Sequence, residues 1–116
     1  MDKKEIGRWG EDQAAKYLRK KRYRIVGRNF SCRFGEIDLI AEDREFIVFV
    51  EVKTRKSDAF ATAREFVTGA KQERLRATAQ LWLQQNPTKK QPRFDVIEVY
   101  GDNGAVAAIE HIENAF

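Results

Sequence analysis

Apolar residues recur along the chain either at the spacing of a helix or at the spacing of a strand. Each change from one spacing to the other indicates a new element. Between residues 2 and 21 the apolar residues recur at helical spacing, which predicts an amphipathic helix. Its apolar stripe consists of Ile6, Trp9, Ala14, Tyr17 and Leu18. Three segments with strand character follow, at 23–29, 35–41 and 46–53. Residues 46–50 are all apolar, which indicates a strand covered on both faces near the middle of a sheet.

The second half of the chain predicts one long helix and then two strands. Thr68 suits the N-cap, and Asn86 followed by Pro87 ends the helix. One side of this helix carries Lys71, Leu75, Thr78, Ala79, Trp82 and Leu83. The two strands are expected at 93–100 and 105–112, joined as a hairpin.

The order of these elements predicts the fold class. A helix, three strands, a second helix and two more strands give an α/β protein with a central mixed five-stranded sheet flanked by helices. The long helix is a crossover that makes the third and fourth strands parallel neighbours. With 116 residues, one domain spanning 1–116 is expected.

Composition narrows the functional classes. The net charge of +4 favours a polyanionic partner only weakly, because many small soluble proteins are equally basic. The single cysteine, Cys32, excludes an internal disulfide and a thiolate metal cage. His111 is the only histidine and is distant in sequence, which argues against a catalytic cysteine. No stretch is apolar over the length that a membrane span needs, so we expect a cytoplasmic protein with no membrane partner.

Two strand-like segments carry charged residues where apolar ones are usual. Alternation along a strand places Glu36 and Asp38 on one face of the second strand, and Glu51 and Lys53 on one face of the third. We expect the intervening turn to be centred on residues 43–44. Asp38 then lies opposite Phe49, Glu36 lies opposite Glu51, and Asp38 and Glu51 are diagonal neighbours about 7 Å apart.

Two carboxylates at that spacing can share one divalent cation. Oxygen ligands suit Mg²⁺ or Mn²⁺, whereas the absence of a cysteine and histidine cluster argues against zinc. The other interpretation of Asp38, Glu51 and Lys53 is a set of surface salt bridges. Glu11 lies at the edge of the first helix's apolar stripe, and taken alone it is an ordinary surface acid. Gly10 beside it lowers helix stability by about 1 kcal/mol, which a close approach of another segment to the backbone would explain.

The joint pattern resembles the uncharacterised UPF0102 family, within the PD-(D/E)xK or restriction-endonuclease-like nuclease superfamily. The resemblance covers nearly the whole chain. The matching segments are 10–11 (GE), 28–29 (RN), 35–40 (GEIDLI), 49–55 (FVEVKTR), Lys71 and 93–96 (RFDV). It implies a restriction-endonuclease-like fold with the site at the edge of the sheet.

The chain is also similar to archaeal Holliday-junction resolvases of that superfamily, in which a helix glutamate joins the site. By this resemblance Glu11, Asp38 and Glu51 are metal ligands and catalytic residues, Lys53 is the catalytic lysine, and Glu36 is an auxiliary acid. The implied cofactor is Mg²⁺ or Mn²⁺, and the implied activity is hydrolysis of phosphodiester bonds in DNA.

Basic residues near these elements are candidates for phosphate contacts: Arg28, Arg55, Lys71 and Arg74. The sequence shows no base-reading motif, so a structure-selective or nonspecific nuclease is expected. The first alternative is a non-catalytic nucleic-acid-binding protein of the same fold with a role in DNA processing. The second is an interaction module that forms a homodimer through residues 109–116, although packing of that tail on the core is the preferred interpretation.

Overall fold

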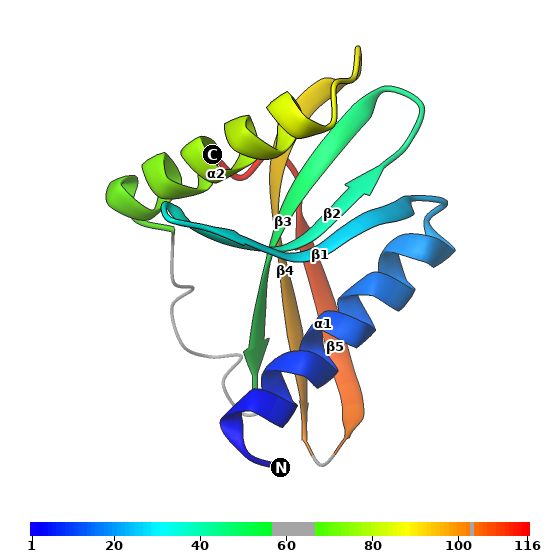
Figure 1. Ribbon diagram of the computed structural model, residues 1–116. Helices are drawn as coiled ribbons and strands as arrows, with labels where there is room; N and C mark the ends of the chain where they lie inside the picture. The colour runs from blue at the N-terminus through cyan, green and yellow to red at the C-terminus, as the bar shows by residue number, and fades with distance from the viewer. Residues whose placement is uncertain (57–66, 103) are drawn as a thin grey trace.

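A computed structural model describes residues 1–56, 67–102 and 104–116 (Figure 1). The stretch 59–67, which suits either a helical turn or a short helix by sequence, lies outside the described residues except for Val67. The elements in chain order are α1 (Lys3–Lys20), β1 (Arg24–Cys32), β2 (Gly35–Glu42), β3 (Phe46–Arg55), α2 (Gly69–Gln85), β4 (Gln91–Asp102) and β5 (Ala105–Ile112).

The five strands form one mixed sheet in the order β1-β2-β3-β4-β5. Among the strands of the described residues only the β3–β4 pair is parallel, and α2 makes the crossover between these two strands. The predicted α/β class, the central position of β3 and the parallel crossover are therefore confirmed. No helix in the described part of the chain is long and apolar enough to cross a bilayer.

The two helices cover opposite faces of the sheet (Figure 1). Alternate residues of β3 divide between two cores: Val48 and Val50 pack with α1, whereas Ile47 and Phe49 pack with α2. This division explains the uninterrupted apolar run of β3, because both of its faces are buried. Ile6 is the exception to the predicted stripe of α1, since it is exposed near the start of the helix.

Helix boundaries follow the predicted caps more closely than strand boundaries do. Thr68 accepts a hydrogen bond from the Lys71 amide, and α2 ends before Asn86. Four strands are longer than predicted, because pairing with a neighbouring strand continues through polar residues: β1 to Cys32, β2 to Glu42, β3 to Arg55, and β4 from Gln91 to Asp102. The C-terminal tail packs on the core, as preferred, with the Phe116 ring 5.1 Å from the ring of Phe94.

The predicted register of the β2–β3 hairpin is wrong by two residues. Leu39 pairs with Val50 and Ile40 with Phe49, so the turn is centred between residues 44 and 45. The side chain of Asp43 is the physical reason, because its Oδ1 accepts hydrogen bonds from the amides of Glu45 and Phe46. These bonds close a four-residue loop instead of a tight two-residue turn.

This shift changes the geometry expected for the acids. Continued by one pair beyond Leu39–Val50, the register places Asp38 directly opposite Glu51 instead of diagonal to it. The recorded pairing stops short of Asp38, where the Val52 amide instead donates a 2.8 Å hydrogen bond to Asp38 Oδ2. Ile37 packs with α2 and Leu39 with α1, although strict alternation would place them on the same face. β2 therefore bends at Asp38 and separates there from β3.

The expected close approach at Gly10 is present. The α-carbon of Gly10 is buried directly against the side chain of Thr54 on β3. A Cβ at residue 10 would overlap the Thr54 hydroxyl, so only glycine lets α1 lie this close to the sheet. This contact sets the height of α1 above β3 and, with it, the position of the next residue, Glu11.

Gly10→Ala is expected to lower the free energy of unfolding by about 1–3 kcal/mol, because the added methyl group must displace Thr54 or the helix. Gly7→Ala in the same helix is the matched control. A Cβ at residue 7 meets no atom within 4 Å, so alanine there should stabilise the protein by up to about 1 kcal/mol. Urea unfolding followed by circular dichroism measures both variants, and equal effects of the two substitutions would contradict the close contact.

Candidate metal centre

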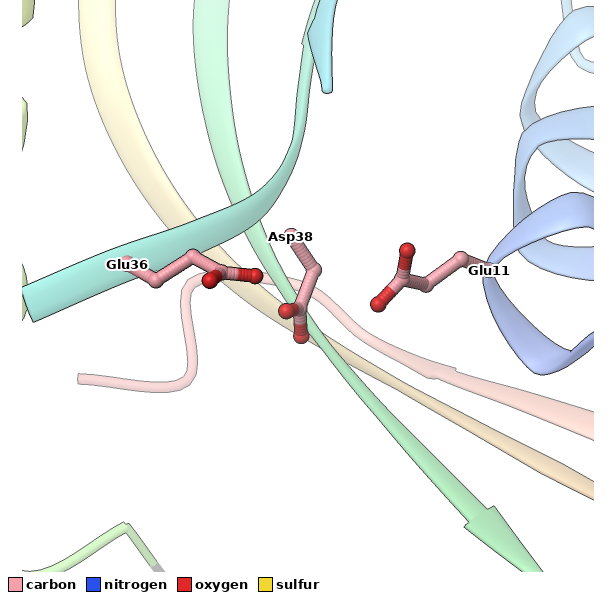
Figure 2. Close-up of side chains that lie close together, drawn as sticks. All are labelled: Glu11, Glu36 and Asp38. Atoms are coloured by element: carbon pink, nitrogen blue, oxygen red, sulfur yellow. The ribbon is translucent and has the colours of Figure 1, made fainter. Parts of the chain in front are cut away.

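Three carboxylates from two elements converge at the bend in β2. Glu11 reaches the site from α1, and Glu36 and Asp38 reach it from β2 (Figure 2). One oxygen from each lies within 4.8 Å of the other two. Residues distant in sequence thus meet because α1 lies close to β3 at Gly10 and β2 departs from regular alternation at Asp38.

Neutral groups orient these carboxylates. Asn29 Nδ2 donates hydrogen bonds to Glu11 at 3.0 Å and to Glu36 at 3.2 Å, and the Ser31 hydroxyl donates to the other oxygen of Glu36. Asn29 has a φ of 50°, a left-handed conformation that asparagine tolerates better than most residues. The side-chain amide of Asn29 carries no charge and links Glu11 of α1 to Glu36 of β2.

Sequence reasoning did not assign a role to Asn29 or Ser31. The available signal was the period of two along β1, which places residues 29 and 31 on one face. Their pairing with Glu36 depends on the β1–β2 register, in which Ser31 lies opposite Glu36.

The electrostatics of the cluster are concentrated at Asp38. Burial, followed by the negative charge of Glu51, raises the pKa of Asp38 from 3.8 to about 7. Glu11 and Glu36 raise it further, and the hydrogen bond from the Val52 amide only partly opposes them. The ionised form of Asp38 is therefore disfavoured, and a bound cation would stabilise it.

The structure places Glu51 differently from the other predicted ligands. Glu51 Oε1 accepts a 2.7 Å hydrogen bond from Lys71 Nζ of α2, in an ion pair where the Glu51 side chain is 12% exposed. The tight group of three thus contains Glu36, predicted as auxiliary, while Glu51 lies beside it with its own cation. Lys53 follows Glu51 by two residues on β3 and is half-buried.

The four predicted phosphate contacts have different surroundings. Arg28 pairs with Asp12 at 2.8 Å, and Arg55 pairs with the buried carboxylate of Glu98 at 3.2 Å. Lys71 holds Glu51, as described above. Arg74 is exposed on α2 beside the turn between β1 and β2. This exposure makes the Arg74 side chain accessible to an external phosphate.

The donor set suits a hard divalent cation. All three converging groups are carboxylates, and two of them, Glu11 and Glu36, accept hydrogen bonds from neutral side chains. Oxygen donors of this kind are the ligands that Mg²⁺ and Mn²⁺ prefer, with water completing the coordination. Fold and site together define a small α/β protein with an acidic cluster beside the point where the pairing of β2 with β3 ends.

Comparison with known proteins identifies the family. Residues 10–99 match the Uncharacterised protein family UPF0102. A UPF0102 protein of Pelotomaculum thermopropionicum is 47% identical over 116 residues, covering 98% of this chain and 97% of that protein. UPF0102 proteins of Nocardia farcinica and Caldicellulosiruptor saccharolyticus are 45% and 44% identical, with 99% and 100% of this chain covered and 91% and 100% of theirs. The chain belongs to the UPF0102 family.

Proposed function

We propose that this protein is a metal-dependent nuclease that hydrolyses phosphodiester bonds of DNA. The observation that carries the proposal is the convergence of Glu11, Glu36 and Asp38 within 4.8 Å of one another. Three carboxylates at this distance repel one another. Burial, then the charge of Glu51, and to a smaller extent those of Glu11 and Glu36, raise the pKa of Asp38. A site that is costly without a cation is expected to serve a function that needs one.

The fold supports the nuclease assignment. The order of a helix, an antiparallel three-stranded unit, a crossover helix and a fourth strand parallel to the third agrees with the restriction-endonuclease-like arrangement that the resemblance implies. In that arrangement Asp38 and Glu51 occupy neighbouring strands, and Lys53 follows Glu51 by two residues.

Each residue has a separate role in the proposed reaction. Glu11, Glu36 and Asp38 would hold Mg²⁺ or Mn²⁺, with Glu51 available beside them once Lys71 moves to a phosphate. When bound, the ion supplies Lewis-acid polarisation of a phosphoryl oxygen. Lys53 would orient the attacking water or neutralise charge that develops on the phosphate. Asn29 holds Glu11 and Glu36 in position throughout.

Substrate selection follows from what the site offers. Arg28, Arg55, Lys71 and Arg74 are cations suited to phosphate groups, and phosphate contacts carry no sequence information directly. We therefore propose a nuclease that selects DNA by its structure or is nonspecific, and that does not read sequence. Binding should weaken steeply as salt concentration rises.

The test is cleavage of branched, single-stranded and duplex DNA in the presence of Mg²⁺ or Mn²⁺. Wild-type protein should cut at least one substrate, EDTA should stop it, and Asp38→Ala should reduce the rate by at least about 100-fold, the scale of a lost key catalytic contact. Glu45→Gln is the matched control, since Glu45 is an exposed acid in the β2–β3 turn. Equal residual cutting by wild type and Asp38→Ala would refute the catalytic role. DNA binding without metal uptake would favour the non-catalytic alternative.

A further inference from the structure

Phe34 is a large apolar side chain exposed close to the acidic cluster. It lies in the turn between β1 and β2 and is 37% exposed. Single exposed apolar residues are common and need no explanation by themselves. Phe34 differs from the others because its turn leads directly into the strand that carries Glu36 and Asp38.

The turn is anchored to α2. Cys32 Sγ lies 3.6 Å from Thr78 Oγ1, and the Phe34 amide donates a 3.4 Å hydrogen bond to the same sulfur. Gly35 lies against Thr78 and Arg74, and Figure 1 shows the turn beside α2. A turn fixed in this way presents its aromatic ring at a low cost in conformational entropy.

One cation lies against the ring, and a second is exposed near its turn. The Arg33 guanidinium lies 4.8 Å from the centroid of the Phe34 ring, a cation–π distance, and Arg74 is exposed on the neighbouring turn of α2. An exposed aromatic ring flanked by cations is the arrangement that proteins use to stack a nucleobase while contacting its backbone.

Spacing connects the ring to the site. Strand geometry of about 3.3 Å per residue places residue 34 about 7 Å from Glu36 and about 13 Å from Asp38 along the chain. A nucleic-acid strand advances about 3.4 Å per nucleotide, so the ring reaches a base about two to four nucleotides from a phosphodiester at the carboxylates.

We infer that Phe34 is a stacking platform for an unpaired base, so that the preferred substrate is DNA with a single-stranded segment beside the phosphodiester to be cut. A base inside a continuous duplex is already stacked on both sides and cannot use the ring. The inference rests on the proposed function and adds the kind of DNA that is preferred. In this inference Phe34, together with Arg33, determines that preference.

The experiment measures binding instead of turnover. Fluorescence anisotropy is recorded with Ca²⁺ in place of Mg²⁺, with intact recovery of the DNA checked on gels. The ligands are a single strand, a perfect duplex and a duplex with a single-stranded arm. Phe34→Ala should lose about 5- to 150-fold in affinity for the two ligands with unpaired bases and less than about twofold for the duplex. Phe34→Trp should retain the affinity, and Val106→Ala, at an exposed apolar residue of β5, is the control.

A second readout reports stacking itself. 2-Aminopurine in the single-stranded arm should be quenched by wild type and by Phe34→Trp, but not by Phe34→Ala. Suppose that wild-type protein binds and cuts DNA. Unchanged single-strand affinity in Phe34→Ala, or an equal loss of affinity for all three ligands, would then overturn the stacking inference and leave the proposed function in place. Wild-type protein that binds none of the ligands would overturn the proposed function and this inference together.

Discussion

Asp38→Asn is expected to make the metal-free protein more stable at pH 8 while removing its affinity for divalent cations. The asparagine keeps an oxygen that can accept the hydrogen bond from the Val52 amide, but it carries no charge toward Glu11, Glu36 and Glu51. The expected gain is about 1–3 kcal/mol, since one pKa unit corresponds to about 1.36 kcal/mol and partial exposure screens part of the effect. Mn²⁺ affinity should fall by more than the 10- to 100-fold loss typical of residues that only support the ligands.

The pH dependence gives this prediction its sign. The pKa of Asp38 is about 7 in the folded protein and about 3.8 in the unfolded chain, so the folded state binds the extra proton between these values. The contribution of Asp38 to stability therefore falls as pH rises from about 4 to 7. Asp38→Asn removes this slope, so its advantage should be largest above pH 7 and vanish near pH 4.

Thermal unfolding in EDTA at a series of pH values, with Mn²⁺ titrated by calorimetry, measures both effects. Glu45→Gln is again the matched control and should change neither quantity, because that side chain is exposed and outside the cluster. A destabilised Asp38→Asn across the whole pH range, or one that binds Mn²⁺ as wild type does, would contradict the interpretation of the cluster as a metal centre. Removal of metal from wild-type protein should lower its melting temperature above pH 7 for the same reason.

The sequence predicted the order of elements because periodicity and caps are local signals. Its error in the β2–β3 register also has a local cause, the side chain of Asp43, which closes a longer loop than expected. Asparagine and aspartate often close turns in this way, so the residue type carried the signal. Because the shift is an even number of residues, it does not by itself turn a side chain to the other face, and Asp38 and Glu51 remained neighbours despite the wrong pairing. Ile37 lies on the opposite face from the predicted one because β2 bends at Asp38.

The composition of the cluster was harder to predict, because it depends on where β2 leaves the sheet. Regular alternation does not show that the strand bends at Asp38, nor that the bend brings Glu36 to the helix acid Glu11. Lys71 was recognised as a cation near the site, but its pairing with Glu51 depends on the placement of α2 over β3. Such long-range placements are set by tertiary packing and leave no periodic trace in one sequence.

The chain contains a second buried aspartate in a strand, and the two cannot be told apart by pattern. Asp95 on β4 is fully buried, yet its environment is the reverse of that of Asp38. Arg93 donates two hydrogen bonds of 2.9 Å to its carboxylate, the Asn114 amide donates a third, and His111 Nε2 lies 2.7 Å from it. Burial alone would raise the pKa of Asp95, but the bonds from His111 and Arg93 outweigh it and hold this pKa below 3.8.

Asp95→Asn is therefore expected to destabilise the protein by about 3–5 kcal/mol, the opposite sign from the same substitution at Asp38. Loss of the carboxylate removes the charged group that hydrogen-bonds to the buried guanidinium of Arg93. The Tyr23 hydroxyl, the Phe46 ring and the more distant Glu113 remain beside it. Because the folded-state pKa of Asp95 is lowered, its contribution is present above about pH 4 and is lost as pH falls through the folded value.

Urea unfolding of both asparagine variants at pH 8, at pH 4 and at about pH 3 tests the contrast directly. The Asp95→Asn deficit should be full at pH 8 and smaller below pH 4, whereas the Asp38→Asn gain should be confined to neutral and alkaline pH. Folded Asp95→Asn protein should bind Mn²⁺ as wild type does, because the Asp95 carboxylate already has its cation within the protein. Changes of the same sign in both variants at pH 8 would show that burial alone governs these two carboxylates. Opposite signs would show that a buried acid paired with its own cation stabilises the fold, whereas one surrounded by other acids destabilises it when no metal is bound.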